Sequence, residues 1–157
     1  FSHSLDEVRN INTDVNSVSL AYAGGPFMAG FGYQTEGLAA GGKTKYTRLS
    51  ASYDIGAAVI KGLYGNVKSP GSLKTNEYSL GVDVPLSGAL TLSGSYGYSK
   101  DNAASGDEKR KGFTLGAMYM LSKRTDLYAG LTDWDGKIGG TKTSGNTRYG
   151  LGMRHAF

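Results

Sequence analysis

Residues 37–44, GLAAGGKT, are the stretch whose spacing most directly suggests chemistry, because they match the phosphate-binding pattern G-x-x-x-x-G-K-[ST]. That pattern binds nucleotides where it follows a buried strand and opens a helix whose amino end faces the phosphate. Here residues 45–53 alternate in polarity as a β-strand does. The pattern therefore predicts an exposed loop between two strands rather than a nucleotide site.

Histidine chemistry has little support in the sequence. His3 and His155 are the only histidines, and neither is spaced with a nucleophile and a carboxylate as a hydrolytic triad would need. There is no cysteine to ligate a metal or form a disulfide. We predict no catalytic residue and no cofactor.

Two acidic clusters are the remaining candidates for a site. Asp133 and Asp135 flank Trp134 and could bind a cation, although this arrangement is more typical of a solvated loop tip. The run 107–110, DEKR, is interpreted as a solvated charge cluster in a loop, because each carboxylate has a cation beside it. No metal site is predicted.

Composition favours a strand protein. The 157 residues include 25 glycines and 11 tyrosines but only 3 prolines. No run of ten apolar residues occurs, so we expect no transmembrane helix and no signal peptide in this sequence. The net charge is +4, and the cations are scattered rather than gathered in a basic stripe, so nucleic-acid binding is not expected.

The last twelve residues, 146–157, read as one strand with two different faces. One face is apolar or aromatic and carries Tyr149, Leu151, Met153, His155 and Phe157. The other face is small or cationic and carries Arg148, Gly150, Gly152, Arg154 and Ala156. Such alternation is the pattern of a β-strand that separates two environments.

Eight earlier segments repeat this alternation, which gives nine predicted strands. Their apolar positions fall within residues 18–22, 27–33, 47–53, 58–64, 78–84, 90–98, 113–119 and 127–131. The predicted connections alternate between short turns (23–26, 54–57, 85–88, 121–124) and longer loops (34–44, 67–74, 100–109, 133–145). Residues 1–15 have no sustained period and are predicted to form an outer loop or a weak strand.

Strand length and turn asymmetry predict an all-β fold, an antiparallel transmembrane β-barrel occupying residues 16–157. Strands of roughly 8 to 11 residues are long enough for a tilted membrane crossing. Short turns on one side and long loops on the other are typical of outer-membrane barrels, and tyrosines gather near both strand ends, as interfacial girdles do.

Charged residues fix which face meets lipid. If the pattern were shifted by one residue, several cations would point into lipid. Each would cost about 2–4 kcal/mol of folding free energy near the bilayer midplane. The polar face is therefore predicted to line a water-filled interior. Its predicted pore-lining residues are Arg48, Lys61, Arg148, Arg154, Glu77, Asp83 and Asp126.

Strand parity predicts that this chain is part of a larger barrel. With the carboxyl end in the periplasm, nine strands place residues 1–15 on the outer side. Bacterial barrels normally have an even number of strands and begin on the periplasmic side. Further strands are therefore expected before residue 1.

Three segments carry a family resemblance: 121–128 (LSKRTDLY), 150–157 (GLGMRHAF) and 16–22 (NSVSLAY). They resemble the carboxyl-terminal half of trimeric proteobacterial general porins, a similarity spanning roughly residues 9–157. The resemblance implies a sixteen-stranded barrel, a homotrimer in the outer membrane of a Gram-negative bacterium, and a non-enzymatic channel for ions and small hydrophilic solutes. It also implies contact with the bilayer and lipopolysaccharide, and Phe157 as a signal to the outer-membrane assembly machinery.

The ion selectivity of the predicted channel can be inferred from Arg48 and Lys61, the two cations near the middle of its wall. A turn at residues 54–57 would place Arg48 opposite Leu63 and Lys61 opposite Ser50, as diagonal neighbours roughly 7–8 Å apart. Adjacent like charges at mid-depth would attract small anions, with Arg148 and Arg154 as feeders, so mild anion selectivity is predicted. The alternative is that acidic partners neutralise the cations.

Two other function classes stay open at this point. One is an outer-membrane barrel with an adhesive or enzymatic role, which would require structured loops or a convergent catalytic set. The other is a soluble β-sandwich that acts as a binding module, since sandwich strands also alternate in polarity.

Overall fold

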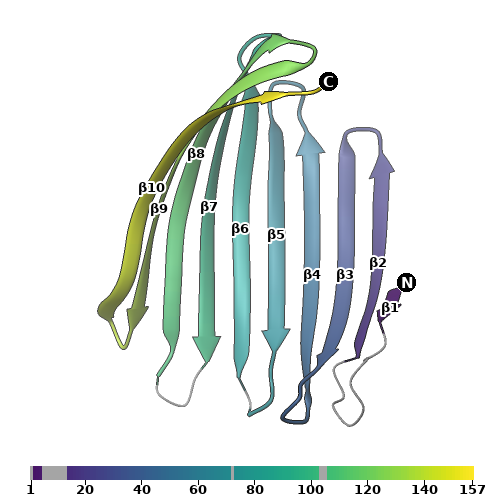
Figure 1. Cartoon of the computed structure of the whole chain (residues 1–157), viewed down its shortest axis with the longest axis vertical. Helices are drawn as coiled ribbons and strands as arrows, with labels where there is room; N and C mark the ends of the chain where they lie inside the picture. The colour runs from purple at the N-terminus through teal and green to yellow at the C-terminus, as the bar shows by residue number, and fades with distance from the viewer. Residues whose placement is uncertain (1, 5–13, 72, 103–105) are drawn as a thin grey trace.

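The computed structural model describes residues 2–4, 14–71, 73–102 and 106–157. These residues form one antiparallel sheet in which ten strands lie side by side in chain order (Figure 1). The strands are β1 (Ser2–Ser4), β2 (Val15–Gly24), β3 (Phe27–Gly37), β4 (Lys43–Asp54), β5 (Val59–Lys68), β6 (Lys74–Pro85), β7 (Leu90–Asn102), β8 (Glu108–Ser122), β9 (Thr125–Ile138) and β10 (Thr141–His155). The nine predicted strands are present as β2–β10, and the antiparallel all-β prediction is confirmed.

Short β1 is the tenth strand and lies in the region predicted as a loop or weak strand. It pairs with the start of β2, where His3 lies opposite Asn16. The rest of that region, apart from Asp14 and Val15, lies outside the described residues.

A single sheet is incompatible with the soluble-sandwich alternative, because a sandwich buries the apolar faces of two packed sheets against each other. Within the described ranges no hydrophobic side chain is buried, and 30 large hydrophobic residues are exposed. Leu20, Leu80 and Leu151 are 68%, 64% and 87% exposed. A soluble protein rarely leaves so much contiguous apolar surface uncovered, so the face of the sheet that carries these leucines needs a lipid environment.

Helices play no part in the described architecture. Within the described ranges, the structure contains no helix with the length and apolarity that a membrane span requires.

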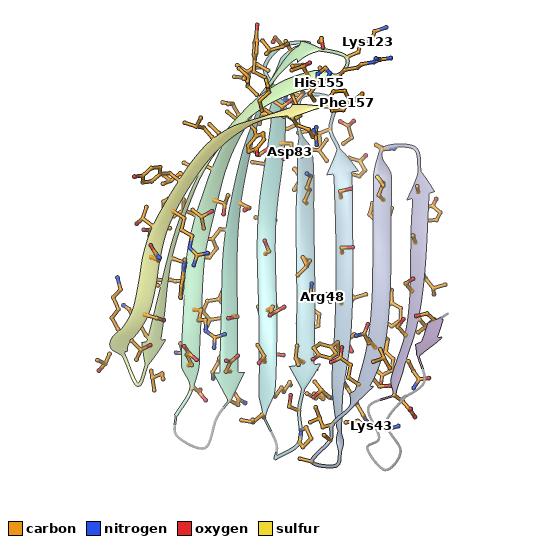
Figure 2. The ribbon with its side chains drawn as sticks, viewed as in Figure 1. Lys43, Arg48, Asp83, Lys123, His155 and Phe157 are labelled. Atoms are coloured by element: carbon orange, nitrogen blue, oxygen red, sulfur yellow. The ribbon has the colours of Figure 1, made fainter. Side chains whose placement is uncertain are left out.

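The connections of the sheet lie at two ends. Turns 25–26, 55–58, 86–89 and 123–124 lie at the same end as the carboxyl terminus, at the top of Figure 1. The carboxyl ends of β3, β5, β7 and β9 lie at the opposite end. We call these the turn end and the loop end. Figure 2 places Lys123, His155 and Phe157 at the turn end and Lys43 at the loop end.

The predicted long loops are wrong in extent, because the strands continue into them. The clearest case is 133–145, where β9 continues to Ile138 and β10 begins at Thr141. Gly139 and Gly140 form the whole connection, with φ of 57° and 90°. A two-residue hairpin turn of type I′ has positive φ at both positions, and glycine adopts this conformation without strain.

Polar side chains misled the prediction of these loops. β7 continues to Asn102 and β8 begins at Glu108, inside the segment predicted as a loop. Backbone hydrogen bonds continue along a ladder whether or not the side chains are polar, and a sheet that projects beyond the bilayer needs no apolar face. Polarity therefore marks where the strand leaves lipid, not where the strand ends.

The phosphate-loop pattern lies between two strands, as expected. Gly37 ends β3, Lys43 begins β4, and Gly41 and Gly42 both have φ of 87° in the turn between them. No helix follows the lysine, so the geometry that binds a nucleotide is not formed.

Candidate pore wall

Cross-strand register places all seven predicted pore-lining residues on one face of the sheet. A row of direct partners links Arg48, Gly65 and Glu77, and another runs from Lys61 through Gly81, Ser95, Thr114 and Thr132 to Arg148. We call this the polar face. The opposite, apolar face carries rows such as Leu20, Phe31, Leu49, Tyr64 and Tyr78.

Arg48 and Glu77 form an ion pair across an intervening strand. The Arg48 Nη2 atom lies 3.7 Å from Glu77 Oε2, although β5 separates their strands. Gly65 lies between them in the same row, and a Cβ there would lie 2.8 Å from Glu77 Oε2. The missing side chain of Gly65 therefore opens the path that the ion pair occupies.

Two more cations of the polar face have carboxylate partners on the next strand. Lys61 on β5 forms an ion pair and hydrogen bond with Asp83 on β6. Arg154 lies directly opposite Asp126 and donates to its Oδ1 from Nε at 3.0 Å and from Nη2 at 2.9 Å. Figure 2 shows Arg48 about midway between the two ends of the sheet and Asp83 towards the turn end, so the pairs are spread along the wall.

The predicted pairing of Arg48 with Leu63 and Lys61 with Ser50 is wrong by two residues. Arg48 lies opposite Gly65, and Lys61 lies opposite Ser52. The two cations are therefore about four residues apart along the strands, roughly 13 Å, and are not neighbours.

The position of the β4–β5 turn explains this error. Asp54 stays in β4, and its Oδ1 accepts a hydrogen bond of 2.7 Å from Gly56 N. The Ile55 amide donates to Ala58 O at 2.9 Å, so the turn occupies residues 55–58 instead of 54–57. Moving a turn by one residue moves the cross-strand register by two.

Arg148 differs from the other predicted cations. Within the described part of the chain, no carboxylate lies within ion-pair distance of its guanidinium, although it shares a cross-strand row with Lys61. Residue 148 is exposed on β10, the strand at the edge of this sheet.

Sequence analysis missed a further ionic cluster on the polar face. Arg110 Nη2 donates to Asp101 Oδ2 at 2.8 Å and to Glu108 Oε2 at 2.6 Å. These residues lie in β7 and β8, in the segment that polarity alone predicted to be a loop. Extending the alternation of Ser95, Gly97 and Ser99 by one step would have placed Asp101 on this face.

The other acidic candidate is also part of the sheet. Asp133, Trp134 and Asp135 lie within β9, not on a loop tip. Asp133 Oδ2 accepts a hydrogen bond of 2.5 Å from Thr147, and Asp135 pairs with Lys137 at 3.9 Å. In the described ranges no three His, Asp or Glu side chains come together as metal ligands.

Small side chains form a hollow on the polar face. The hollow has a volume of ≈ 540 Å³, and Ser50, Ser52, Ser79, Gly81 and Ser95 contribute to its lining beside Lys61. Short residues leave space where longer ones would project, so the wall is recessed next to the Lys61–Asp83 pair.

Solvent exposure decides what these ion pairs do. The side chains of Arg48 and Arg154 are 62% and 71% exposed. Exposed pairs contribute about 0–1 kcal/mol to stability. Their larger effect is on the electric field along this face, because each carboxylate offsets the field of one cation.

Known proteins share both the sequence and the fold. Outer membrane porin protein 32 of Delftia acidovorans is 32% identical over 100% of this chain, which covers 52% of that protein. An outer membrane porin protein of Bordetella pertussis is 37% identical over 54% of this chain. The chain thus spans about half the length of the Delftia relative, and its match covers 22% of the Bordetella one.

Solved structures agree at the level of the fold. OmpT of Vibrio cholerae, an outer-membrane protein, superposes with a TM-score of 0.70 at 20% identity, covering 92% of this chain and 57% of that one. A trimer form of the in-vitro folded OmpT gives 0.69. The model of the Gram-negative porin family matches residues 2–139. This chain therefore belongs to the Gram-negative porin family, and its sheet is the wall of an outer-membrane β-barrel.

Proposed function

We propose that the protein forms a water-filled channel through which ions and small hydrophilic solutes diffuse passively across the outer membrane. The observation that carries this proposal is the two-sided sheet: one face exposes large apolar side chains, and the other carries ion pairs and hydroxyls. Charged groups are too costly to bury in a dry interior, whereas water solvates them in a lumen. The channel has no enzymatic role in this proposal.

The rest of the barrel is part of the same proposal. Residues 15–155 supply β2–β10, and strands outside this chain complete a sixteen-stranded barrel. Its partners are the bilayer, lipopolysaccharide, two further copies of the protein in a trimer, and the assembly machinery. The trimer form of the Vibrio cholerae protein supports the oligomeric state.

Conductance measurements test the channel directly. The complete protein, purified from outer membranes and added to a planar lipid bilayer, is expected to give stepwise increases in current. A barrel with an adhesive role and a closed lumen would insert into the bilayer without any conductance steps. That result would reject the proposed channel.

We also propose that the channel is mildly anion-selective. We assign this selectivity to Arg148 rather than to Arg48 and Lys61, because the charges of those two residues are offset by carboxylate partners. The Arg148 guanidinium is exposed on the polar face and has no carboxylate partner in the described ranges. We expect Arg148→Ser to shift the zero-current potential in a salt gradient toward cation preference. An unchanged potential would remove Arg148 from the selectivity mechanism.

Phe157 is proposed as the assembly signal. Regular pairing of β10 ends at His155, but the Ala156 amide still donates to Arg124 O at 2.8 Å, so the chain stays in line with β9. The Phe157 ring contacts the His155 ring edge-on, 5.0 Å between centroids, and is otherwise exposed. A free aromatic at a strand end can be recognised without unfolding the barrel.

Deletion of Phe157 is therefore expected to lower the yield of folded barrel in cells while leaving the stability of the folded fraction nearly unchanged. The folded fraction can be measured by heat-modifiable gel mobility. His155→Ala is the matched control, because it removes the ring contact but keeps the terminal residue. An equal yield with and without Phe157 would reject the assembly role.

A further inference from the structure

The single tryptophan of this chain, Trp134, lies on the polar face of the sheet. It belongs to a row of direct partners that runs from Ser79 through Gly97, Gly112 and Trp134 to Asn146. In membrane barrels tryptophan is more usual on the outer surface, at the level where lipid meets water. An indole on the polar face therefore needs another explanation.

Glycines make room beside the indole. A Cβ at Gly112 would lie 2.6 Å from Trp134 Cβ, so a larger residue at this position would clash. Gly97 comes next in the row, and a Cβ there would approach only Tyr78 O, at 4.0 Å, among the described residues outside its chain neighbours. Trp134 itself is half-buried, so part of its surface stays accessible. The indole thus borders a stretch of wall that carries no side chain.

A hollow of ≈ 360 Å³ opens at this point, and we call it the Trp134 hollow. Hydroxyl side chains from four strands contribute to its lining: Ser79, Ser95, Ser99, Thr114 and Thr132. The volume falls within the range of about 300–1,000 Å³ that is typical of small-molecule sites. Such sites usually combine an aromatic side chain with a few polar groups, which is the composition found here.

The charged side chains of the polar face that reach the Trp134 hollow are Glu77 and Arg110, and both are already paired. Glu77 lies 3.7 Å from Arg48, and Arg110 donates hydrogen bonds to Asp101 and Glu108. Because carboxylates offset the field of each cation, a small anion would gain little at this part of the wall. A neutral solute with many hydrogen-bonding groups can still use the hydroxyls.

We propose that the Trp134 hollow is a subsite for small sugars, that is, neutral solutes with a polyhydroxylated ring. The proposal rests on the proposed channel function and names one class of solute for it. The face of an aromatic ring carries partial negative charge, so the weakly positive C–H groups of a pyranose ring pack well against it. Serine and threonine hydroxyls both donate and accept hydrogen bonds, as sugar hydroxyls do.

The position of the hollow suits an entry site. Trp134 lies four residues before Ile138, where β9 ends at the loop end. With the loop end outside, as proposed, a solute would meet the indole soon after it enters the lumen. Binding at such a site has to be weak, because a solute that is held tightly does not move on.

Sugar binding can be measured without relying on conductance. Saturation-transfer NMR of lactose with the complete, detergent-solubilised protein compares three variants with the unmodified one. Trp134→Ala removes the indole, and Trp134→Phe keeps a smaller aromatic face. Tyr128→Ala is the matched control, because Tyr128 is an exposed aromatic residue on the same strand and the same face but does not line the hollow.

We expect Trp134→Ala to bind lactose roughly three- to tenfold more weakly than the unmodified protein, and Trp134→Phe to recover most of that loss. Tyr128→Ala should bind lactose as the unmodified protein does. Saturation should be strongest at the C–H protons of the sugar ring, and sorbitol, which has hydroxyls but no ring, should bind more weakly than lactose. Equal lactose binding by Trp134→Ala and Tyr128→Ala, or tighter binding of uridine than of lactose, would overturn the proposal.

Gly97→Leu provides a second test that leaves the indole in place. The new side chain has space at this position and would fill part of the hollow. Lactose binding should fall as it does in Trp134→Ala, while heat-modifiable gel mobility shows that the barrel still folds. Full lactose binding by Gly97→Leu would reject the site.

Conductance separates this proposal from the channel itself. Stepwise conductance of the unmodified protein without lactose binding would reject the sugar subsite and leave the channel standing. Lactose binding that depends on Trp134, without any conductance, would support the subsite and reject the channel.

Discussion

Replacing Leu80 with arginine is expected to lower the free energy of unfolding of the barrel in a bilayer by about 2–4 kcal/mol. Leu80 lies midway along β6 and is 64% exposed on the apolar face. A guanidinium at this depth has neither water nor a partner, and the strand cannot slip by one residue without turning its whole polar face into lipid. Denaturant titration of folded protein in lipid, followed by heat-modifiable mobility, measures the change.

Ser79→Arg is the matched control, one residue away on the same strand. Ser79 faces the other way and lines the ≈ 540 Å³ hollow, where water can solvate a guanidinium. We expect this variant to lose less than about 1 kcal/mol, since no charge enters lipid. Equal destabilisation by the two substitutions would mean that the two faces do not meet different solvents, and the barrel assignment of the faces would be wrong.

Neutralising the acidic partners should make the channel more anion-selective. In Glu77→Gln/Asp83→Asn the side chains keep nearly the same size, but Arg48 and Lys61 lose the carboxylates with which they pair. The uncompensated cations then attract anions and repel cations in the lumen, which should change the permeability ratio by roughly severalfold. The zero-current potential in a salt gradient reports this ratio.

A variant that removes the two cations instead of the two carboxylates tests the same ion pairs in the opposite direction. Arg48→Ser/Lys61→Ser leaves Glu77 and Asp83 uncompensated, so the potential should move toward cation preference. Asp107→Asn/Asp135→Asn removes two carboxylates from the opposite face of the sheet and should change the potential little. If Glu77→Gln/Asp83→Asn leaves the potential unchanged, these ion pairs do not lie along the ion path.

In the proposed channel, ion pairing sets the electric field that a solute would meet along the wall. Paired charges spread along the wall give alternating local fields instead of one cationic ring. Such a wall offers polar contacts to hydrophilic solutes while keeping the net field low, which suits a general channel better than a strongly selective one. Arg148 then stands out as the cation whose field is not offset by a described neighbour.

The nine longer strands and the facing of their side chains could be predicted from the sequence because both depend on a local period. Side chains alternate every residue along a strand, and a charge in lipid is so costly that Arg48, Lys61 and Arg154 leave one choice of face. The family, the outer membrane and the antiparallel order follow from the same pattern together with the terminal segments.

Register and strand ends could not be predicted in this way. The pairing of Arg48 with Gly65 depends on where the Asp54 side chain caps the β4–β5 turn, and a turn moved by one residue keeps the same face while shifting every partner by two. Polar strand ends look like loops, because side-chain polarity reports the surrounding solvent and not the backbone ladder.

The sequence by itself thus determined which residues lie on the polar face and which lie on the apolar face, since that choice depends on each side chain and its parity. Only the tertiary structure decided which charges meet: Arg48 reaches Glu77 across Gly65, and Lys100, Lys109, Lys137 and Lys142 fall into one row. These neighbours come from different strands, and their distances depend on the cumulative register of every turn between them.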